Sequence, residues 1–249
     1  MKLTVLGNNG TYPQENGACS SYLITEGRYT LLIDMGNGSL AKLQHVCDVG
    51  AINAIVLSHL HFDHFADIIP LRYALETRRS KGIPIQPVHV YVPSAPSWLM
   101  KELSANDVFI LHRIHDRFSV AEGPFSLFFR KVKHSIASYA VRVAHGSEVF
   151  VYSSDTAMCN SLLSIARDAD LLLCEASYIG RDLGQEGHHL SARLAGRVAS
   201  VAQVGRLLLT HLPNDHDPAV VVREAAQEFP NVQATDLHAT YPIKKLQRT

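Results

Sequence analysis

The sequence predicts an α/β fold with two sheets in one continuous unit, residues 1–249. In the first half, short β-branched apolar runs alternate with stretches of helical spacing. Between Phe118 and Tyr152 there are three strand-like runs and no helix, and from Met158 onward the alternation resumes. No Pro-, Gly- or Ser-rich linker divides the chain. Two sheets flanked by helices satisfy this order of elements.

The expected strands are short apolar runs, most of them bounded by turn residues. They comprise residues 3–7, 30–34, 54–58, 88–92, 127–133, 139–143, 148–153, 170–175 and 206–210. Helical spacing joins Ile68, Leu71 and Leu75, and it appears again from Leu190 to Val201. The four prolines between Ser80 and Pro96 predict a loop that leads into a strand.

Composition excludes several classes of protein. Because 23 Lys and Arg balance 23 Asp and Glu, the chain lacks the general positive field of nonspecific nucleic-acid binders. No apolar run approaches the roughly 18 residues of a membrane-spanning helix. Four scattered cysteines without a CxxC pair predict reduced thiols in a cytoplasmic protein. Any polyanion must therefore bind at a local site.

A cluster of possible metal ligands follows the apolar run 54–58. It contains His59, His61, Asp63 and His64 within six positions. If the strand ends at Ser58, alternation places His59 and His61 on the same side, and the turn into the next helix brings Asp63 and His64 to a second position nearby. Imidazole nitrogens and a carboxylate oxygen suit Zn²⁺ or a similar first-row ion.

Three more candidates lie at or just past the C-terminal end of an expected strand, where side chains reach the rim of a sheet. They are His134, Asp155 and His211. The first expected site is rich in nitrogen and comprises His59, His61 and His134. The second comprises Asp63, His64 and His211. Asp155 would bridge the two ions.

The spacing His59-Leu-His61-Phe-Asp63-His64 resembles the HxHxDH motif of the metallo-β-lactamase superfamily, and the later candidates follow in that family's order. The resemblance implies a four-layer αββα sandwich with a dinuclear site at one edge. It implies two divalent ions, with zinc expected and manganese or iron also compatible. Asp34 matches the family's first-motif aspartate and is expected to orient a ligand. Three hydroxyl residues directly precede ligands: Ser58, Ser154 and Thr210. Each either orients the ligand or forms a hydrogen bond with the backbone of its own strand.

Later motifs resemble the ribonuclease Z branch of this superfamily. The segment His134-Ser-Ile-Ala-Ser138-Tyr139 is similar to its HxxxSY motif, and Cys174-Glu175-Ala176-Ser177 is similar to its HEAT-like loop. In that branch a histidine before a Ser or Thr pairs with the loop glutamate and assists the leaving group. The resemblance assigns this role to His189, with His188 as the alternative, beside Glu175. An aspartate at 155, where well-known zinc β-lactamases carry cysteine, argues against β-lactam hydrolysis.

We therefore expect a metal-dependent hydrolase, a phosphodiesterase with a bridging hydroxide as nucleophile. Ligand and metal charges leave a net charge of about +1, which suits a diester monoanion, and Asp63 could accept the proton of the nucleophile. The expected substrate is a small or nucleotide-like phosphodiester, including a cyclic one. Three alternatives stay open: a lactone or thioester hydrolase, a tRNA 3′-processing endoribonuclease, and a non-catalytic metal-binding protein.

The same sequence features predict the partners of the protein. Only 20 residues separate His134 from Asp155, which leaves no room there for the tRNA-gripping arm of ribonuclease Z. We therefore expect no stable nucleic-acid complex and no membrane partner. The relatives suggested by the resemblance are commonly dimers, so a homodimer is expected.

Overall fold

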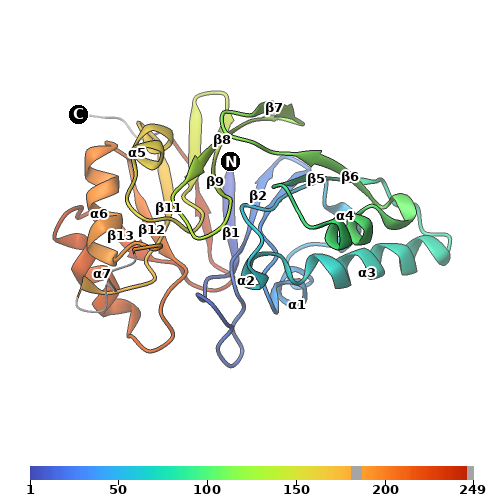
Figure 1. Ribbon diagram of the computed structural model, residues 1–249, viewed down its shortest axis with the longest axis horizontal. Coiled ribbons are helices and arrows are strands. Elements are labelled where there is room, and N and C mark those ends of the chain that lie inside the picture. The colour runs from blue at the N-terminus through green and yellow to red at the C-terminus, as the bar shows by residue number, and fades with distance from the viewer. Residues whose placement is uncertain (181–186, 246–249) are drawn as a thin grey trace.

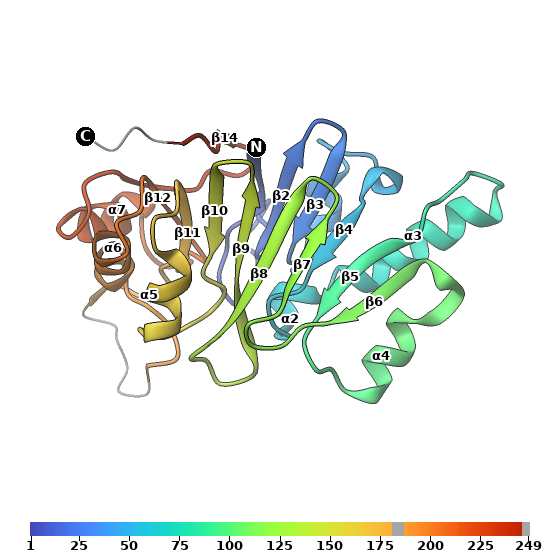
Figure 2. The ribbon, with the colours of Figure 1, turned by 90° about the horizontal axis from the view of Figure 1, so that it is seen from above.

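The computed structural model describes residues 1–180 and 187–245. Two seven-stranded sheets pack face to face, and helices cover both outer faces (Figures 1 and 2). In Figure 1, α1, α3 and α4 lie on one side of the paired sheets and α5, α6 and α7 on the other. The predicted four-layer αββα sandwich is confirmed.

The first sheet has the strand order β14-β1-β2-β3-β4-β5-β6. Its strands are β1 (Lys2–Gly7), β2 (Ser21–Glu26), β3 (Tyr29–Ile33), β4 (Ala54–Val56), β5 (Val88–Val92), β6 (Phe109–Arg113) and β14 (Thr240–Pro242). The helices of this half are α1 (Ser39–Leu43), α2 (Phe62–Phe65), α3 (Ile68–Ser80) and α4 (Ser97–Leu103), with 3-10 turns at Val49–Ala51 and Ala105–Asp107.

The second sheet has the order β13-β12-β11-β10-β9-β8-β7. Its strands are β7 (Ser119–Glu122), β8 (Phe125–Val132), β9 (Ser138–His145), β10 (Glu148–Tyr152), β11 (Leu171–Glu175), β12 (Leu207–Thr210) and β13 (Val232–Ala234). Its helices are α5 (Asn160–Ala166), α6 (Ala192–Val201) and α7 (Pro218–Ala226). Local signals begin two of them: Ser191 caps α6 by accepting from the Leu194 N–H, and Asp217 with Pro218 begins α7.

Alternation along the strands builds three apolar layers. Leu31 and Ile33 point into the core between the sheets, whereas Leu32 points toward the helices of the first half. Likewise Leu173 faces the other sheet and Leu172 faces the helices of the second half. Each sheet is therefore apolar on both faces, which explains why its central strands are continuous apolar runs instead of alternating ones.

The strand directions create the rim that carries the site. Strands β3, β4 and β5 run parallel to one another, and so do β10, β11 and β12. Their C-terminal ends therefore lie at one edge of each sheet, and the segments that follow them can meet across the sandwich.

The structure differs from the sequence prediction mainly at the edges. Strands β6, β7, β13 and β14 are edge strands that the sequence does not predict, and β2 is also unpredicted. Strand β4 ends at Val56, two residues before the expected end, because the Ser58 N–H bonds to the Asp34 carboxylate instead of continuing the ladder. All four cysteines are free thiols. Within the described ranges, no helix has the length and apolar character needed to cross a membrane.

Candidate metal centre

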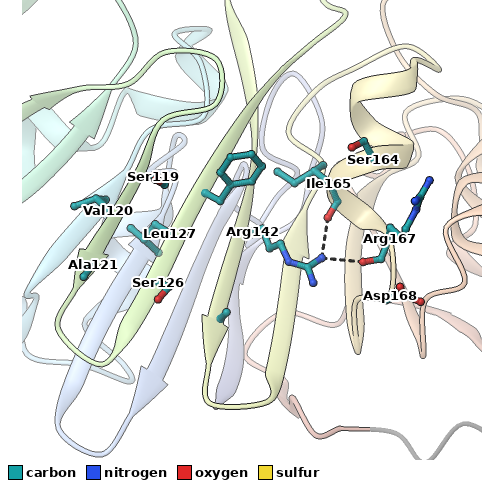
Figure 3. Close-up of a pocket in the computed structure, with 12 residues that line it drawn as sticks. Ser119, Val120, Ala121, Ser126, Leu127, Arg142, Ser164, Ile165, Arg167 and Asp168 are labelled. Atoms are coloured by element: carbon teal, nitrogen blue, oxygen red, sulfur yellow. Dashed lines mark hydrogen bonds between the residues drawn. The ribbon is translucent and has the colours of Figure 1, made fainter.

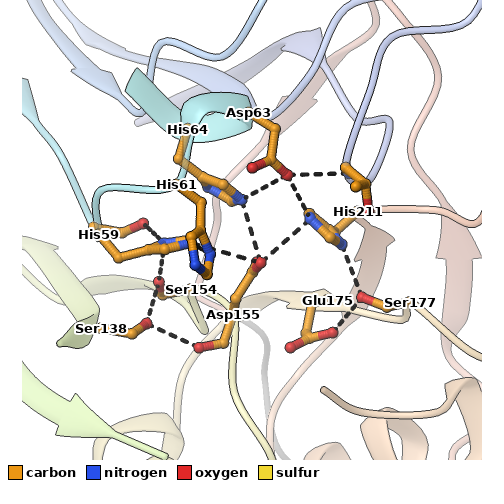
Figure 4. Close-up of polar contacts among 12 residues, drawn as sticks. His59, His61, Asp63, His64, Ser138, Ser154, Asp155, Glu175, Ser177 and His211 are labelled. Carbon is orange, nitrogen blue, oxygen red and sulfur yellow. Dashed lines mark hydrogen bonds and ion pairs between the residues drawn. The ribbon is translucent and has the colours of Figure 1, made fainter. Parts of the chain in front are cut away.

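All seven predicted ligands meet at the rim formed by the C-terminal strand ends. Figure 4 labels these ligands with the exception of His134. The segment after β4 and the short helix α2 supply four of them, and the segments after β8, β10 and β12 supply one each. Two groups of potential ligand atoms result. One comprises His59, His61, His134 and Asp155. The other comprises Asp63, His64, Asp155 and His211.

The first group is rich in nitrogen, as the sequence predicts. The Nδ1 atom of His61 lies 3.2 Å from Nε2 of His59 and 3.1 Å from Nε2 of His134. An oxygen of Asp155 lies 3.7 Å from the same His59 nitrogen. Three imidazole nitrogens and one carboxylate oxygen thus converge on a common point.

The second group brings two carboxylates and two imidazoles together. The Nε2 atom of His211 lies 3.2 Å from Oδ2 of Asp63 and 3.3 Å from Oδ2 of Asp155. The Nε2 atom of His64 lies 3.3 Å from the same Asp155 oxygen and 3.5 Å from Oδ2 of Asp63. Asp155 belongs to both groups, which is the arrangement required of a bridging ligand.

An unpartnered buried atom shows that these residues fit a metal ion. Oδ1 of Asp155 is buried and makes no hydrogen bond, and the buried Nε2 of His64 faces the carboxylates of Asp155 and Asp63. Leaving a buried carboxylate oxygen without a partner costs folding free energy, and a bound cation would offset this cost. Nitrogen and carboxylate donors in this combination suit a first-row divalent ion.

Hydrogen bonds hold the opposite ring nitrogens of four histidines, which fixes the nitrogen that faces the site. The Nδ1 atoms pair as follows: His59 with Ser58 Oγ at 3.1 Å, His64 with Asp34 Oδ2 at 2.8 Å, His134 with the His188 carbonyl at 3.0 Å, and His211 with Ser177 Oγ at 2.8 Å. His61 differs, because its Nδ1 atom faces the site.

Asp34 anchors this arrangement from directly after β3. Its carboxylate accepts hydrogen bonds from the Ser58 N–H and hydroxyl, each at 2.7 Å, and from the Tyr152 hydroxyl at 3.0 Å. Together with its contact to His64, this matches the orienting role expected of Asp34. Of the other expected orienting residues, Ser154 lies 3.4 Å from His59 Nδ1, whereas the Thr210 hydroxyl bonds to Tyr22.

The electrostatics keep the carboxylates ionised. Burial raises the pKa of Asp155, but the neighbouring His211, His64 and His59 lower it well below its usual value. Burial likewise raises the pKa of Asp63, and hydrogen bonds with His211 and His64 outweigh that effect and lower it. Burial lowers the pKa of His59, which favours the neutral imidazole that metal ligation requires.

The backbone around the site is unusually constrained. Thr11, Asp34, Ser154 and His211 all adopt a positive φ, between 51° and 64°, a conformation that non-glycine residues rarely take. Gly10 passes so close to His211 that a Cβ atom there would lie 2.7 Å from its Nδ1. The fold accepts this local strain where the ligands are held.

Glu175 and His189 form the pair that the resemblance implies. Nδ1 of His189 lies 3.1 and 3.2 Å from the two carboxylate oxygens of Glu175, which also accepts from the Thr156 N–H. Burial lowers the pKa of His189, but Glu175 outweighs this and raises the pKa to about 9. His188 contacts His134, through its backbone carbonyl and its ring. His189 is thus the histidine that pairs with Glu175, and its role as proton donor to the leaving group stays a prediction.

Ser177 is a residue of the site that sequence reasoning missed. Its hydroxyl donates to Glu175 Oε2 at 2.5 Å and lies 2.8 Å from His211 Nδ1 and 3.2 Å from His189 Nδ1. One side chain thus links a potential metal ligand to the Glu175–His189 pair. Its position two residues after Glu175 in the HEAT-like loop was the available signal.

A large cavity lies away from the candidate metal centre. It has a volume of about 840 Å³ and opens on the outer face of β7, β8 and β9 beside α5 (Figure 3). Arg142 in its wall donates to the carbonyl oxygens of Ile165 and Arg167 at the end of α5, so this guanidinium supports the helix. None of the potential metal ligands lines this cavity, which makes size a poor guide to the site here.

Sequence comparison identifies the family. Residues 29–212 match the family model described as a beta-lactamase superfamily domain. The chain is 35% identical over 221 residues to the probable metallo-hydrolase YhfI of Bacillus subtilis, covering 86% of this chain and 88% of that protein. It is 25% identical to the ribonuclease Z of Myxococcus xanthus, covering 92% and 93% of the two chains.

Structural comparison agrees. The crystal structure of the metallo-beta-lactamase fold protein YhfI from Bacillus subtilis superposes with a TM-score of 0.92 at 32% identity, covering 96% of this chain and 98% of that one. The short form of human tRNase Z gives a TM-score of 0.79 at 21% identity, covering 98% and 100%. The chain therefore belongs to the beta-lactamase superfamily, as a metallo-hydrolase of that fold.

Proposed function

We propose that this protein is a dinuclear-metal phosphodiesterase acting on a small or nucleotide-like phosphodiester, including cyclic ones. The observation that carries the proposal is the Glu175–His189 pair, whose imidazole Nδ1 lies 3.8 Å from the Asp155 oxygen shared by both ligand groups. Hydrolysis of an ester with a poor leaving group requires a proton donor, which this pair would supply beside the two ions.

The cofactor in this proposal is a pair of divalent ions, with zinc favoured and manganese or iron compatible. When bound, the ions would lower the pKa of a water molecule and draw charge from the phosphoryl oxygens. His59, His61 and His134 would hold one ion, Asp63, His64 and His211 the other, and Asp155 would contact both. The lowered pKa of Asp63 makes it a weak base, which favours its role as a ligand over that of proton acceptor.

His189 would supply the proton to the leaving oxygen. Its Nδ1 faces Glu175, so Nε2 is the nitrogen left for the substrate, and the raised pKa keeps the ring protonated near pH 7. Glu175 would act by fixing the orientation and the charge of this ring. An alkoxide leaves poorly without a proton, so this pair would matter most for phosphodiesters of alcohols.

The segment between His134 and Asp155 argues against precursor tRNA as substrate. Strands β9 and β10 occupy most of it, and only residues 146–147 connect them. A small diester as partner therefore fits better than a large RNA. The absence of a stable nucleic-acid complex, the homodimer and the cytoplasmic location stay predictions.

A substrate panel tests the proposal. Protein loaded with zinc or manganese is assayed on bis(p-nitrophenyl) phosphate and on cyclic nucleotides, with Asp63→Ala as the control. We expect turnover of diesters well above the control. No turnover above Asp63→Ala would overturn the proposal, and hydrolysis of lactones or thioesters without any diester would replace it with an acyl hydrolase.

The proton donor is tested by the choice of leaving group. His189→Ala should slow hydrolysis of diesters with alkoxide leaving groups by roughly 10²- to 10⁴-fold. The loss should be much smaller for p-nitrophenolate, which leaves readily without a proton. An equal loss on both kinds of substrate would contradict the assignment of His189 as the acid.

A further inference from the structure

A pocket of about 310 Å³ adjoins the Glu175–His189 side of the metal centre. The loops that follow β1, β11 and β12 form its walls. His189 and His211 belong to the same wall, so a group bound in the pocket lies beside both the proposed proton donor and a potential metal ligand. If His189 donates the proton, the leaving group of the substrate would lie on this side.

One wall of the pocket presents an exposed aromatic ring on a braced loop. Tyr12 is 61% exposed and lines the pocket. The loop beneath it is held by three hydrogen bonds: Thr11 N–H to Asp63 Oδ2 at 3.0 Å, Asn214 Nδ2 to the Tyr12 carbonyl at 2.8 Å, and Gln14 Nε2 to the Asn214 carbonyl at 2.7 Å. An exposed ring on a loop held in this way is available for stacking against a ligand in the pocket.

A second aromatic ring lines the pocket from the loop after β11. Tyr178 belongs to the lining, and its ring meets that of His189 edge-on at 5.9 Å. Two tyrosines from loops far apart in the sequence thus line a pocket that begins at the proposed acid. Flat aromatic groups are the ligands that such rings bind best.

Away from its two histidines, the described lining of the pocket holds no positive charge. Apart from histidines, the one ionisable group of clear charge in the described lining is the Asp215 carboxylate, whose side chain is 80% exposed, and no described lining residue is Lys or Arg. The six residues 181–186, outside the described part, contain one arginine and two acids. Among the described lining residues, a second phosphate away from the two histidines would meet the Asp215 carboxylate and no arginine or lysine.

We infer that this pocket is the leaving-group subsite, and that it takes a compact, uncharged, aromatic alcohol such as a nucleoside and disfavours a leaving group that carries a further phosphate. This inference rests on the proposed phosphodiesterase function. In the reaction, water oxygen forms the new bond to phosphorus, the bond to the leaving oxygen breaks, and His189 protonates that oxygen. The products are a phosphomonoester and the free alcohol.

The test compares diesters that differ only in charge on the leaving side. The dinucleoside monophosphate ApA is assayed beside ApA with an additional 5′- or 3′-terminal phosphate, and the products identify the leaving nucleoside. We expect a phosphate on that nucleoside to lower kcat/KM at least tenfold. Asp215→Lys should shrink this discrimination to a few-fold, because it replaces the carboxylate with a cation.

Tyr12→Ala measures the stacking contribution. It should lower kcat/KM on ApA about tenfold, mainly through KM, which is the size of one base-stacking contact. The matched control is Tyr73→Ala, which removes another exposed tyrosine, on α3 and outside the pocket lining, and should change nothing.

Two failures can be told apart. If the loaded protein hydrolyses no diester at all, the proposed function fails. If it hydrolyses ApA and its phosphorylated forms equally well, or if Tyr12→Ala behaves like Tyr73→Ala, the phosphodiesterase stands and the subsite assignment is overturned.

Discussion

Two clusters of acids and histidines join the sheets of this protein, and they differ in how their polar atoms are satisfied. At the candidate metal centre, Asp155 Oδ1 is buried without a hydrogen bond. In the second cluster, which comprises Glu122, Tyr29, His89 and Tyr91, both oxygens of Glu122 are used. Glu122 accepts from the hydroxyls of Tyr29 and Tyr91 and from His89 Nδ1.

The two buried carboxylates differ in their hydrogen bonds and not in the direction of their pKa shifts. Burial raises the pKa of Glu122, and its three donors outweigh that effect and lower it, as histidines do for Asp155. A lowered pKa therefore occurs in both places and does not separate them. The hydrogen bonds of the two carboxylates do separate them, because both oxygens of Glu122 have donors, whereas Oδ1 of Asp155 has none.

The largest expected effect comes from the residue shared by both ligand groups. Asp155→Ala should reduce bound metal to less than roughly a tenth of the wild-type content and slow hydrolysis about a thousandfold or more, because several kcal/mol of charge stabilisation are lost. Metal content is measured by elemental analysis after gel filtration. The matched variant Glu122→Gln, in the other cluster, should bind as much metal as the wild-type protein. Equal losses of metal in both variants would contradict the assignment of Asp155 as a metal ligand.

An intermediate effect is expected from Ser177, which contacts a ligand without being one. Ser177→Ala removes the partner of His211 Nδ1 and should weaken zinc binding about 10- to 100-fold, as loss of an orienting partner does elsewhere. Competition with a chromophoric chelator measures the affinity. Ser177→Thr keeps the hydroxyl and should restore binding. Ser161→Ala, on α5 beside Cys159, is the matched control, and an equal loss there would argue for a general effect on folding.

A smaller effect, on stability alone, is expected at the completed cluster. Glu122→Gln replaces a charged acceptor with a neutral amide and should lower the free energy of unfolding by about 1–3 kcal/mol. Urea denaturation measures the change. An unchanged midpoint would mean that the three hydrogen bonds to Glu122 contribute little to the joining of the sheets.

The effect of Glu122 should depend on pH with a definite sign. Because its folded-state pKa is lowered, its contribution to stability is complete above its unfolded pKa of about 4.3 and is lost as pH falls through the folded value. The difference between wild type and Glu122→Gln in unfolding free energy should therefore shrink between pH 6 and pH 3. A difference that grows in acid would contradict the lowered pKa.

Much of the centre could be predicted because its residues stand in local patterns. The four ligands around α2 form one motif, and His134, Asp155 and His211 each follow an apolar strand. The central strands are apolar runs because each packs on both faces, so they are also predictable. Edge strands such as β13 and β14 have three residues each and pair on one side, so their local signal is weak.

Contacts between distant segments could not be predicted from the sequence. The Thr11 N–H on Asp63 is a backbone group, which carries no residue preference. Tyr152 reaches Asp34 across 118 positions, and Glu122 collects its donors from β3 and β5. A single sequence does not show to which carboxylate a tyrosine hydroxyl will donate. These partners can therefore be identified only from the packing of the two sheets.

The hydrogen bonds of the Asp34 carboxylate link the two sheets to the candidate metal centre. It stands at the end of β3 in one sheet, and the Tyr152 hydroxyl that reaches it belongs to β10 in the other. The same carboxylate holds Ser58 and His64. Sliding of one sheet past the other would therefore break the support of His64 at the same moment, so partial unfolding and metal release should occur as one event.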